Sequence, residues 1–263
     1  MITTSLASCG SRPVFWQRQP RFPLPIMQFL RDRLTASMKD PDQRSVLVWP
    51  TILGAPRLQE EFPEGIPFGT LMQRASGLMG PMGLASAERC WERDLSRFPD
   101  TAELGSQGWR VHTSWAPMAS LVSLRSGVTL LALMGHPGEA DFPIGVASAL
   151  FNSALYHECH DVLEPLWGDA RGHVKAGLQG LILLTAGFHH QQLHNAPGMV
   201  GLWEDAINIL ALRSGELETP WGTLNYTAAV EAASTRLAWM EGKDQDADLA
   251  PLWDLPRPHW ELM

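Results

Sequence analysis

The chain has 263 residues, of which 45% are hydrophobic and 18% are charged. This composition excludes general disorder and supplies enough apolar material for one large domain or two of ordinary size. The net charge is −8, and an acidic surface repels the phosphate backbone, so we expect no nucleic-acid partner.

The cysteines and the apolar stretches bear on the compartment. Cys9, Cys90 and Cys159 lie far apart, so they predict neither a disulfide framework nor paired zinc ligands, and we expect a cytoplasmic protein. The longest apolar stretches contain His, Arg, Gln or Gly at short intervals, so we expect no membrane span. The sequence leaves open whether translation starts at Met1 or at Met27.

Residues 1–44 are predicted to form an N-terminal arm and one helix. The first 23 residues carry basic side chains, no acid and scattered prolines, which is typical of a loose chain end. From Leu24 to Lys39 the apolar residues recur at helical spacing, and Asp40-Pro41 favours a helix end at this point.

Residues 45–135 are predicted to form a small α+β unit. Ser45–Ile52 is short, rich in β-branched residues and contains Pro50, which favours an edge strand. Ser86 is the predicted N-cap of a helix that ends near Arg97. The other predicted strands are Trp109–Thr113 and a hairpin of 121–124 and 128–133 around Arg125-Ser126-Gly127.

A turn-rich connector at 136–143 precedes a more helical region. Residues 142–240 predict a bundle of four helices, at about 145–167, 171–194, 195–213 and 225–240, with Asn195 capping the third. Residues 241–263 form an acidic tail whose tryptophans, Trp253 and Trp260, are expected to dock on the bundle. The predicted fold class is α+β overall, with a C-terminal all-α helical bundle preceded by a small α+β unit.

The first predicted helix of the bundle carries the most informative spacing. Tyr156, His160, Glu164 and Trp167 fall within an arc of about 80° at 100° per residue. The main apolar arc of this helix lies beside them, so the His–Glu pair is expected at the margin of the buried face. His160 and Glu164 are i,i+4 neighbours and can touch.

Two chemistries suit this pair, and a third interpretation is purely structural. A carboxylate beside an imidazole favours its protonated form and orients it, as in a general acid or base. Two helical side chains at i,i+4 can also ligate one divalent metal ion. The structural alternative is a buried hydrogen bond that joins two helices. The spacing alone does not decide between them.

The second predicted helix of the bundle is apolar nearly all round. Its polar exceptions Gln179 and His190 lie on nearly one line, and either residue could face the His160–Glu164 pair, depending on the register of the two helices. His189 points elsewhere on the helix, and a structural role is expected for it.

The segment from Phe151 to about Leu210 resembles the domain-of-unknown-function 309 family (DUF309). The family's His-x-x-x-Glu-x-x-Trp signature is matched by His160, Glu164 and Trp167, and its Leu-Gln-Gly-Leu-Ile run by 178–182. The resemblance implies a small all-α bundle and no activity. The chain departs from the family pattern at His157 and Asp161, and His157 is therefore expected to be a surface variation.

Two functions remain open at this point. The first is a non-catalytic or structural module whose polar His/Glu pocket binds a small ligand or a partner. The alternative is a metal- or acid/base-dependent enzyme acting on a small polar molecule, so the sequence leaves open whether the chain is an enzyme. The pocket candidates are Tyr156, Glu158, His160, Glu164, Trp167, Gln179 and His190; the catalytic candidates are His160, Glu164 and Asp161; the candidate ligands for a divalent metal are His160, Glu164 and His190.

Overall fold

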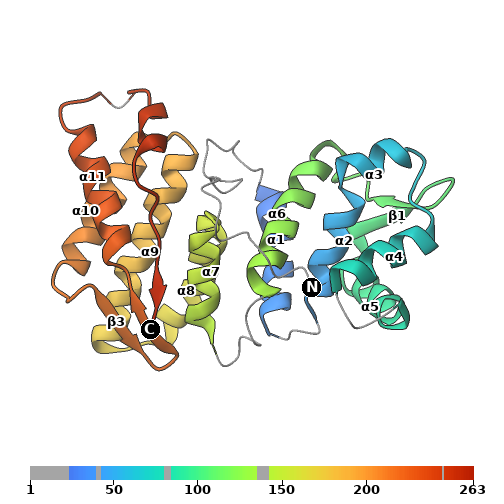
Figure 1. Cartoon of the computed structure of the whole chain (residues 1–263), viewed down its shortest axis with the longest axis horizontal. Coiled ribbons are helices and arrows are strands. Elements are labelled where there is room, and N and C mark those ends of the chain that lie inside the picture. Colours follow the sequence, from blue (N-terminus) through green and yellow to red (C-terminus); the bar gives the residue numbers. More distant parts are fainter. Residues whose placement is uncertain (1–23, 40–42, 80–83, 135–141, 245) are drawn as a thin grey trace. The chain divides into compact units, whose positions relative to one another are not determined.

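The computed structural model describes residues 24–39, 43–79, 84–134, 142–244 and 246–263 (Figure 1). Within these ranges the chain is mostly helical, with small antiparallel sheets. It divides into two compact units, an N-terminal unit of residues 22–149 and a C-terminal unit that contains residues 150–263. The predicted arm at 1–23 and most of the predicted connector at 136–143 lie outside the described residues.

The N-terminal unit contains six helices among its described residues and one two-stranded sheet. The helices are α1 (Leu24–Lys39), α2 (Ser45–Leu53), α3 (Pro56–Glu61), α4 (Phe68–Met79), α5 (Leu84–Arg97) and α6 (Ala119–Met134). The strands are β1 (Ala102–Leu104) and β2 (Trp109–Val111). α7 (Pro143–Asn152) crosses the division between the units.

The predicted edge strand at Ser45–Ile52 is wrong, because this segment forms α2. Eight of its nine residues are buried, Pro50 among them. In a short run that is apolar on all sides, the sequence shows neither the two-residue period of a strand nor the 3.6-residue period of a helix. Packing between neighbouring helices therefore determines its conformation. Thr51, a β-branched residue, fits the helix because its hydroxyl donates to the Leu47 carbonyl at 2.6 Å.

The predicted hairpin at 121–133 is also wrong, because α6 runs straight through it. Arg125 and Ser126 are buried, at 1% and 0% exposure, so they are not turn residues. Gly127 serves helix packing instead: a Cβ there would lie 3.2 Å from Cγ2 of Thr51 on α2. The glycine therefore permits the close approach of α2 and α6.

Two smaller predictions in this unit had mixed outcomes. α5 begins at Leu84, before Ser86, so the predicted N-cap at Ser86 is wrong. The strand predicted at Trp109–Thr113 is confirmed in its first part, where β2 pairs antiparallel with β1.

One described helical stretch, which joins a short 3-10 helix at Ala116–Met118 to α6, is long and apolar enough to cross a membrane by length and composition. It has 19 residues and a mean hydropathy of 1.4, and 44% of that window is buried within the chain. Buried helices of water-soluble proteins meet the same criterion, so a single helix of this kind is weak support for a membrane span.

The C-terminal unit is built on four longer helices. They are α8 (Tyr156–Asp169), α9 (Gly172–Gln192), α10 (Ala196–Leu210) and α11 (Thr227–Met240). The single helix predicted at 145–167 is wrong, because the chain breaks between α7 and α8, where Ala154 has a φ of 57°. The cap predicted at Asn195 is confirmed: its side-chain oxygen accepts a hydrogen bond from the Gly198 backbone N–H at 3.2 Å.

A three-stranded antiparallel sheet corrects the prediction that this region is all-α. β3 (Glu216–Thr219) and β4 (Gly222–Asn225) form a hairpin, and β5 (Glu261–Leu262), near the C-terminus, pairs with β4. Gly222 has a φ of 128°, a conformation that suits glycine and explains the tight turn. The strands are too short to have shown a clear alternation in the sequence.

The C-terminal segment packs on the helices, as its tryptophans predicted. The Trp260 ring is 2% exposed and stacks on Phe151, with ring centroids 4.0 Å apart. Asn152 holds the backbone of Trp260 in place. Its side-chain nitrogen donates to the Trp260 carbonyl, and its side-chain oxygen accepts from the Trp260 backbone N–H. Trp253 lies close to the His194 ring, 6.3 Å between centroids.

Trp260→Ala is expected to lower the free energy of unfolding of the C-terminal unit by about 3–5 kcal/mol, because it leaves a cavity against Phe151. The measurement is urea denaturation followed by circular dichroism. Met263→Ala is the matched control near the same chain end; its side chain is 64% exposed, and a change below about 0.5 kcal/mol is expected. Equal effects of the two variants would contradict the packing role of Trp260.

Candidate functional site

α8 has one buried face and a polar margin. Cys159, Val162 and Leu163 are at most 2% exposed and turn toward the helices of the C-terminal unit. The side chains of His160 and Glu164 are 29% and 44% exposed. The position predicted for this pair, beside the buried face of the helix, agrees with these values.

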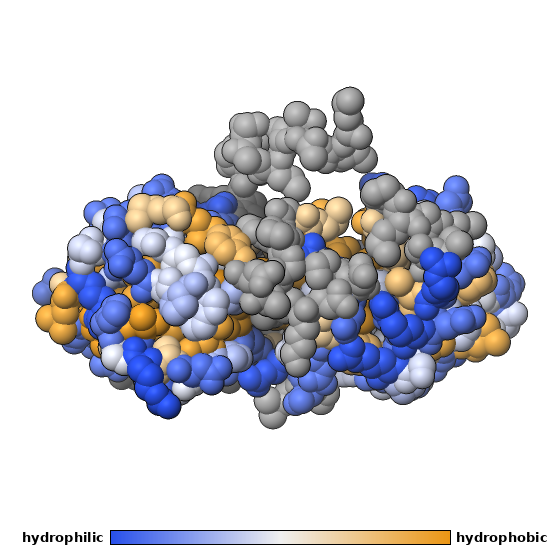
Figure 2. All heavy atoms as spheres, turned by 90° about the horizontal axis from the view of Figure 1, so that it is seen from below, coloured by the Kyte–Doolittle hydropathy of each residue, from blue (hydrophilic) through white to orange (hydrophobic). Residues whose placement is uncertain are grey.

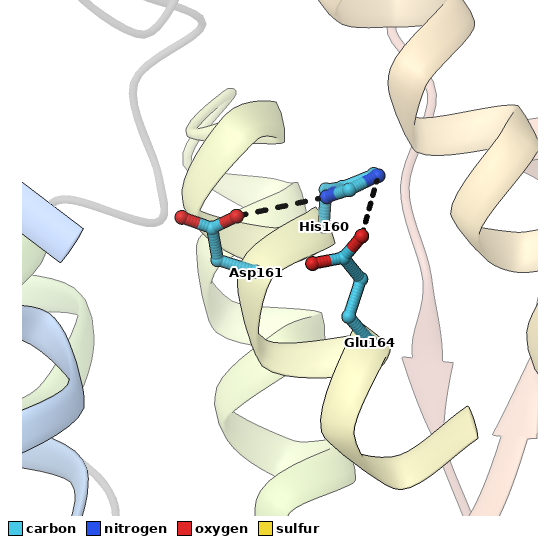
Figure 3. A group of neighbouring side chains, drawn as sticks. All are labelled: His160, Asp161 and Glu164. Atoms are coloured by element: carbon cyan, nitrogen blue, oxygen red, sulfur yellow. Dashed lines mark ion pairs between the residues drawn. The ribbon is translucent and has the colours of Figure 1, made fainter. Parts of the chain in front are cut away.

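His160 lies between two carboxylates, and each of its ring nitrogens faces a different one (Figure 3). Nε2 is 3.8 Å from Oε1 of Glu164, one helical turn further along. Nδ1 is 3.7 Å from Oδ1 of Asp161. Ligand atoms of the three residues all lie within 4.8 Å of one another. The helix therefore gathers one imidazole and two carboxylates into a set suited to a cation or a proton.

Asp161 also contacts His157, which extends the set into a row along α8. Its second oxygen, Oδ2, is 3.5 Å from Nδ1 of His157. Burial alone would lower the pKa of His157, but the hydrogen bond and charge of Asp161, with a smaller contribution from Glu158, outweigh burial and raise it. His157, Asp161, His160 and Glu164 thus alternate base and acid; we call them the α8 row.

The two aromatic pocket candidates on α8 differ in their surroundings. Tyr156 is 1% exposed and stacks on Phe188, so its ring belongs to the core. Burial raises the pKa of its hydroxyl. Trp167 is half-buried at the other end of the helix, with the Lys175 ammonium 4.4 Å from its ring centroid. The Tyr156 ring is therefore packed in the core, whereas the Trp167 ring has a cation on one face.

The α9 histidine that approaches the α8 row is His189. Its ring centroid is 5.3 Å from that of His157. The His190 ring instead accepts a hydrogen bond from the Asn195 side-chain amide at 2.7 Å, at the start of α10. Sequence reasoning missed His189 because the register of α8 against α9 depends on packing, which the helical period alone does not define.

The two remaining pocket candidates, Glu158 on α8 and Gln179 on α9, are buried and half-buried, respectively. Glu158 is buried at 6% exposure, in the first turn of α8, where a negative charge is favourable. Gln179 lies half-buried on α9, and none of the described contacts joins it to His160.

Cys159 is the thiol nearest to the α8 row in sequence, and the structure makes it unreactive. Its side chain is fully buried, and burial raises the pKa of the thiol above its usual value.

The comparisons with known proteins bear on the same helices. Residues 146–202 match the family model described as Domain of unknown function (DUF309). The segment 146–202 is of the DUF309 type. The resemblance noted in the sequence is thereby confirmed for the part of the chain that contains α8 and α9. No significant match was found among curated proteins or among solved structures. The DUF309 match carries no activity, so the function has to be argued from geometry.

The raised pKa of His157 predicts a pH dependence of stability. A group whose pKa is higher in the folded state stabilises the fold below its unfolded pKa, about 6.5, and this contribution disappears as the pH rises through the folded value. His157→Gln should therefore destabilise the chain more at pH 5.5 than at pH 8.5. These values lie about one pH unit below and about two pH units above the unfolded pKa.

The measurement is the urea midpoint of both proteins at both values of pH. Asp161→Asn, which removes the charge that raises the pKa, should reduce the same difference. A destabilisation by His157→Gln that is independent of pH would contradict the assignment.

Proposed function

We propose that the C-terminal unit is a non-catalytic helical module that binds a divalent transition-metal ion at His160 and Glu164. The supporting observation is the pairing of the two nitrogens of His160 with different carboxylates. Nε2 faces Glu164, the second ligand. Nδ1 faces Asp161, which would accept its proton and orient the ring. A histidine that ligates a metal commonly donates its other N–H to a carboxylate in this manner.

The distances support an ion of zinc type. Zinc bonds to His nitrogen and carboxylate oxygen are about 2.0–2.2 Å long, so two ligands at a tetrahedral ion lie about 3.4 Å apart. Nε2 of His160 and Oε1 of Glu164 are 3.8 Å apart. A small rotation of the exposed Glu164 side chain closes this difference. The site thus requires no movement of the α8 backbone.

The exposure of the pair indicates a weak and open site. Two protein ligands leave two positions of a tetrahedral ion for water or for an external ligand. The Glu164 side chain is 44% exposed, so it loses conformational freedom on binding and affinity is reduced. We expect reversible binding and exchange with solvent, as in a module that holds a labile ion or a ligand bound through that ion.

The alternative is an enzyme in which His160 is a general acid or base. Its favouring observation is the same imidazole between two carboxylates, which suits a proton carrier without a metal. Zinc binding separates the two proposals, because a proton carrier at His160 needs no metal ion. A cytoplasmic location, without a nucleic-acid or membrane partner, remains part of the proposal; the separated cysteines support the location, and the acidic composition supports the absence of a nucleic-acid partner.

The test is isothermal titration of the full chain with Zn²⁺ at pH 7.5, a pH at which an unperturbed histidine is neutral, its pKa being about 6.5. Glu164→Gln should abolish measurable binding, because an amide oxygen is a poor substitute for a carboxylate. Asp161→Asn should weaken binding by about 10–100-fold, since it removes the group that orients the ring.

Glu231→Gln is the matched control, because Glu231 is an exposed acid on α11 with no place in the α8 row. It should bind zinc as the parent does. Absence of zinc binding by the parent would contradict the proposal. An unchanged affinity of Glu164→Gln would contradict it as well.

A further inference from the structure

A groove between α10 and α11 forms a second candidate site, independent of the α8 row. Its volume is about 690 Å³. Protein sites for small organic ligands usually measure about 300–1,000 Å³ and are lined mainly by apolar side chains. The apolar lining residues are Ala196, Pro197, Val200, Gly201, Leu237, Ala238 and Met240.

Small side chains produce the hollow. On α10, Gly201 has no side chain, and a Cβ built there would meet no atom within 4 Å. On the facing helix, Ala238 is exposed. The space between the two helices is therefore open above a floor that includes Val200 and Leu237. An apolar group placed there would remove these side chains from water.

The charged residues of the groove have an acidic balance. Glu204 lines it from α10, and Glu241 and Asp244 line it from the chain that follows α11. These three carboxylates are accompanied by one cation, Lys243, whose ammonium lies 4.2 Å from the Trp239 ring centroid. An anionic ligand would be repelled by this set, whereas a cation would be attracted.

We infer that this groove binds a small amphiphilic organic cation. Its apolar body would lie on Val200, Leu237 and Met240, and its positive group would lie near the carboxylates of Glu204 or Glu241. Three properties of the groove select this ligand: the volume fits a small molecule, the floor is apolar, and the charge of the lining is complementary to a cation. Figure 2 shows hydrophobic residues among hydrophilic ones on one face of the molecule.

The experiment titrates the full chain with two aromatic dyes of opposite charge. Thioflavin T is the cationic probe and 8-anilinonaphthalene-1-sulfonate is the anionic one. Thioflavin T should bind at a single site, with an affinity that falls as salt is added, because exposed charges are screened. The anionic dye should bind more weakly and should not compete.

Gly201→Leu fills the groove without disturbing the packing beneath it, since the position is open and helical. It should weaken thioflavin T binding by at least about tenfold, a change that corresponds to removal of the apolar contact. Gly69→Leu is the matched control, because Gly69 is also a helical glycine with no atom near its Cβ position, and it does not line the groove.

The double variant Glu204→Gln/Glu241→Gln tests the charge of the ligand. It should lower the affinity for thioflavin T by about threefold or more and remove most of the salt dependence of that affinity. The inference would be overturned if thioflavin T failed to bind below about 1 mM. It would also be overturned if Gly201→Leu behaved like Gly69→Leu, or if the anionic dye bound more tightly at the same site.

Discussion

The contact on which the candidate site depends is the imidazole of His160 between two carboxylates of the same helix. Three positions of α8 produce it: residue 161 follows directly, and residue 164 lies one turn away on the same side. The arrangement is stable only while α8 keeps its orientation, with Cys159 and Leu163 in the core. Packing of the adjacent buried face therefore holds the polar side chains at the boundary with solvent, where a ligand can reach them.

Aromatic packing supports this orientation from the N-terminal side of α8. Phe151, Tyr156 and Phe188 form a cluster from α7, α8 and α9, with ring centroids 5.1–5.8 Å apart. Trp260 covers this cluster by stacking on Phe151, so the C-terminal segment completes the core that positions α8. The C-terminal segment is thus part of the C-terminal unit, and β5 joins it to the sheet through β4.

Local chemistry made part of this structure predictable. The Asn195 cap followed from a side chain that satisfies a helix N-terminus, and the His160–Glu164 contact followed from the helical period. α2 was misassigned because a short apolar run that is buried all round carries no distinguishing period, and α6 because Arg125-Ser126-Gly127 resembles a hairpin turn. The neighbour of the α8 row on α9, His189, depends on how two helices pack. That contact could not be derived from either helix alone.

The sharpest test of the proposed metal site is the nitrogen NMR signal of His160 during zinc titration. The two ring nitrogens report separately on coordination and on protonation. We expect Nε2 to shift to the value of a metal-bound nitrogen, while Nδ1 stays protonated against Asp161. A His160 ring whose two nitrogens are unchanged by zinc, in a chain that remains folded, would contradict the proposed site.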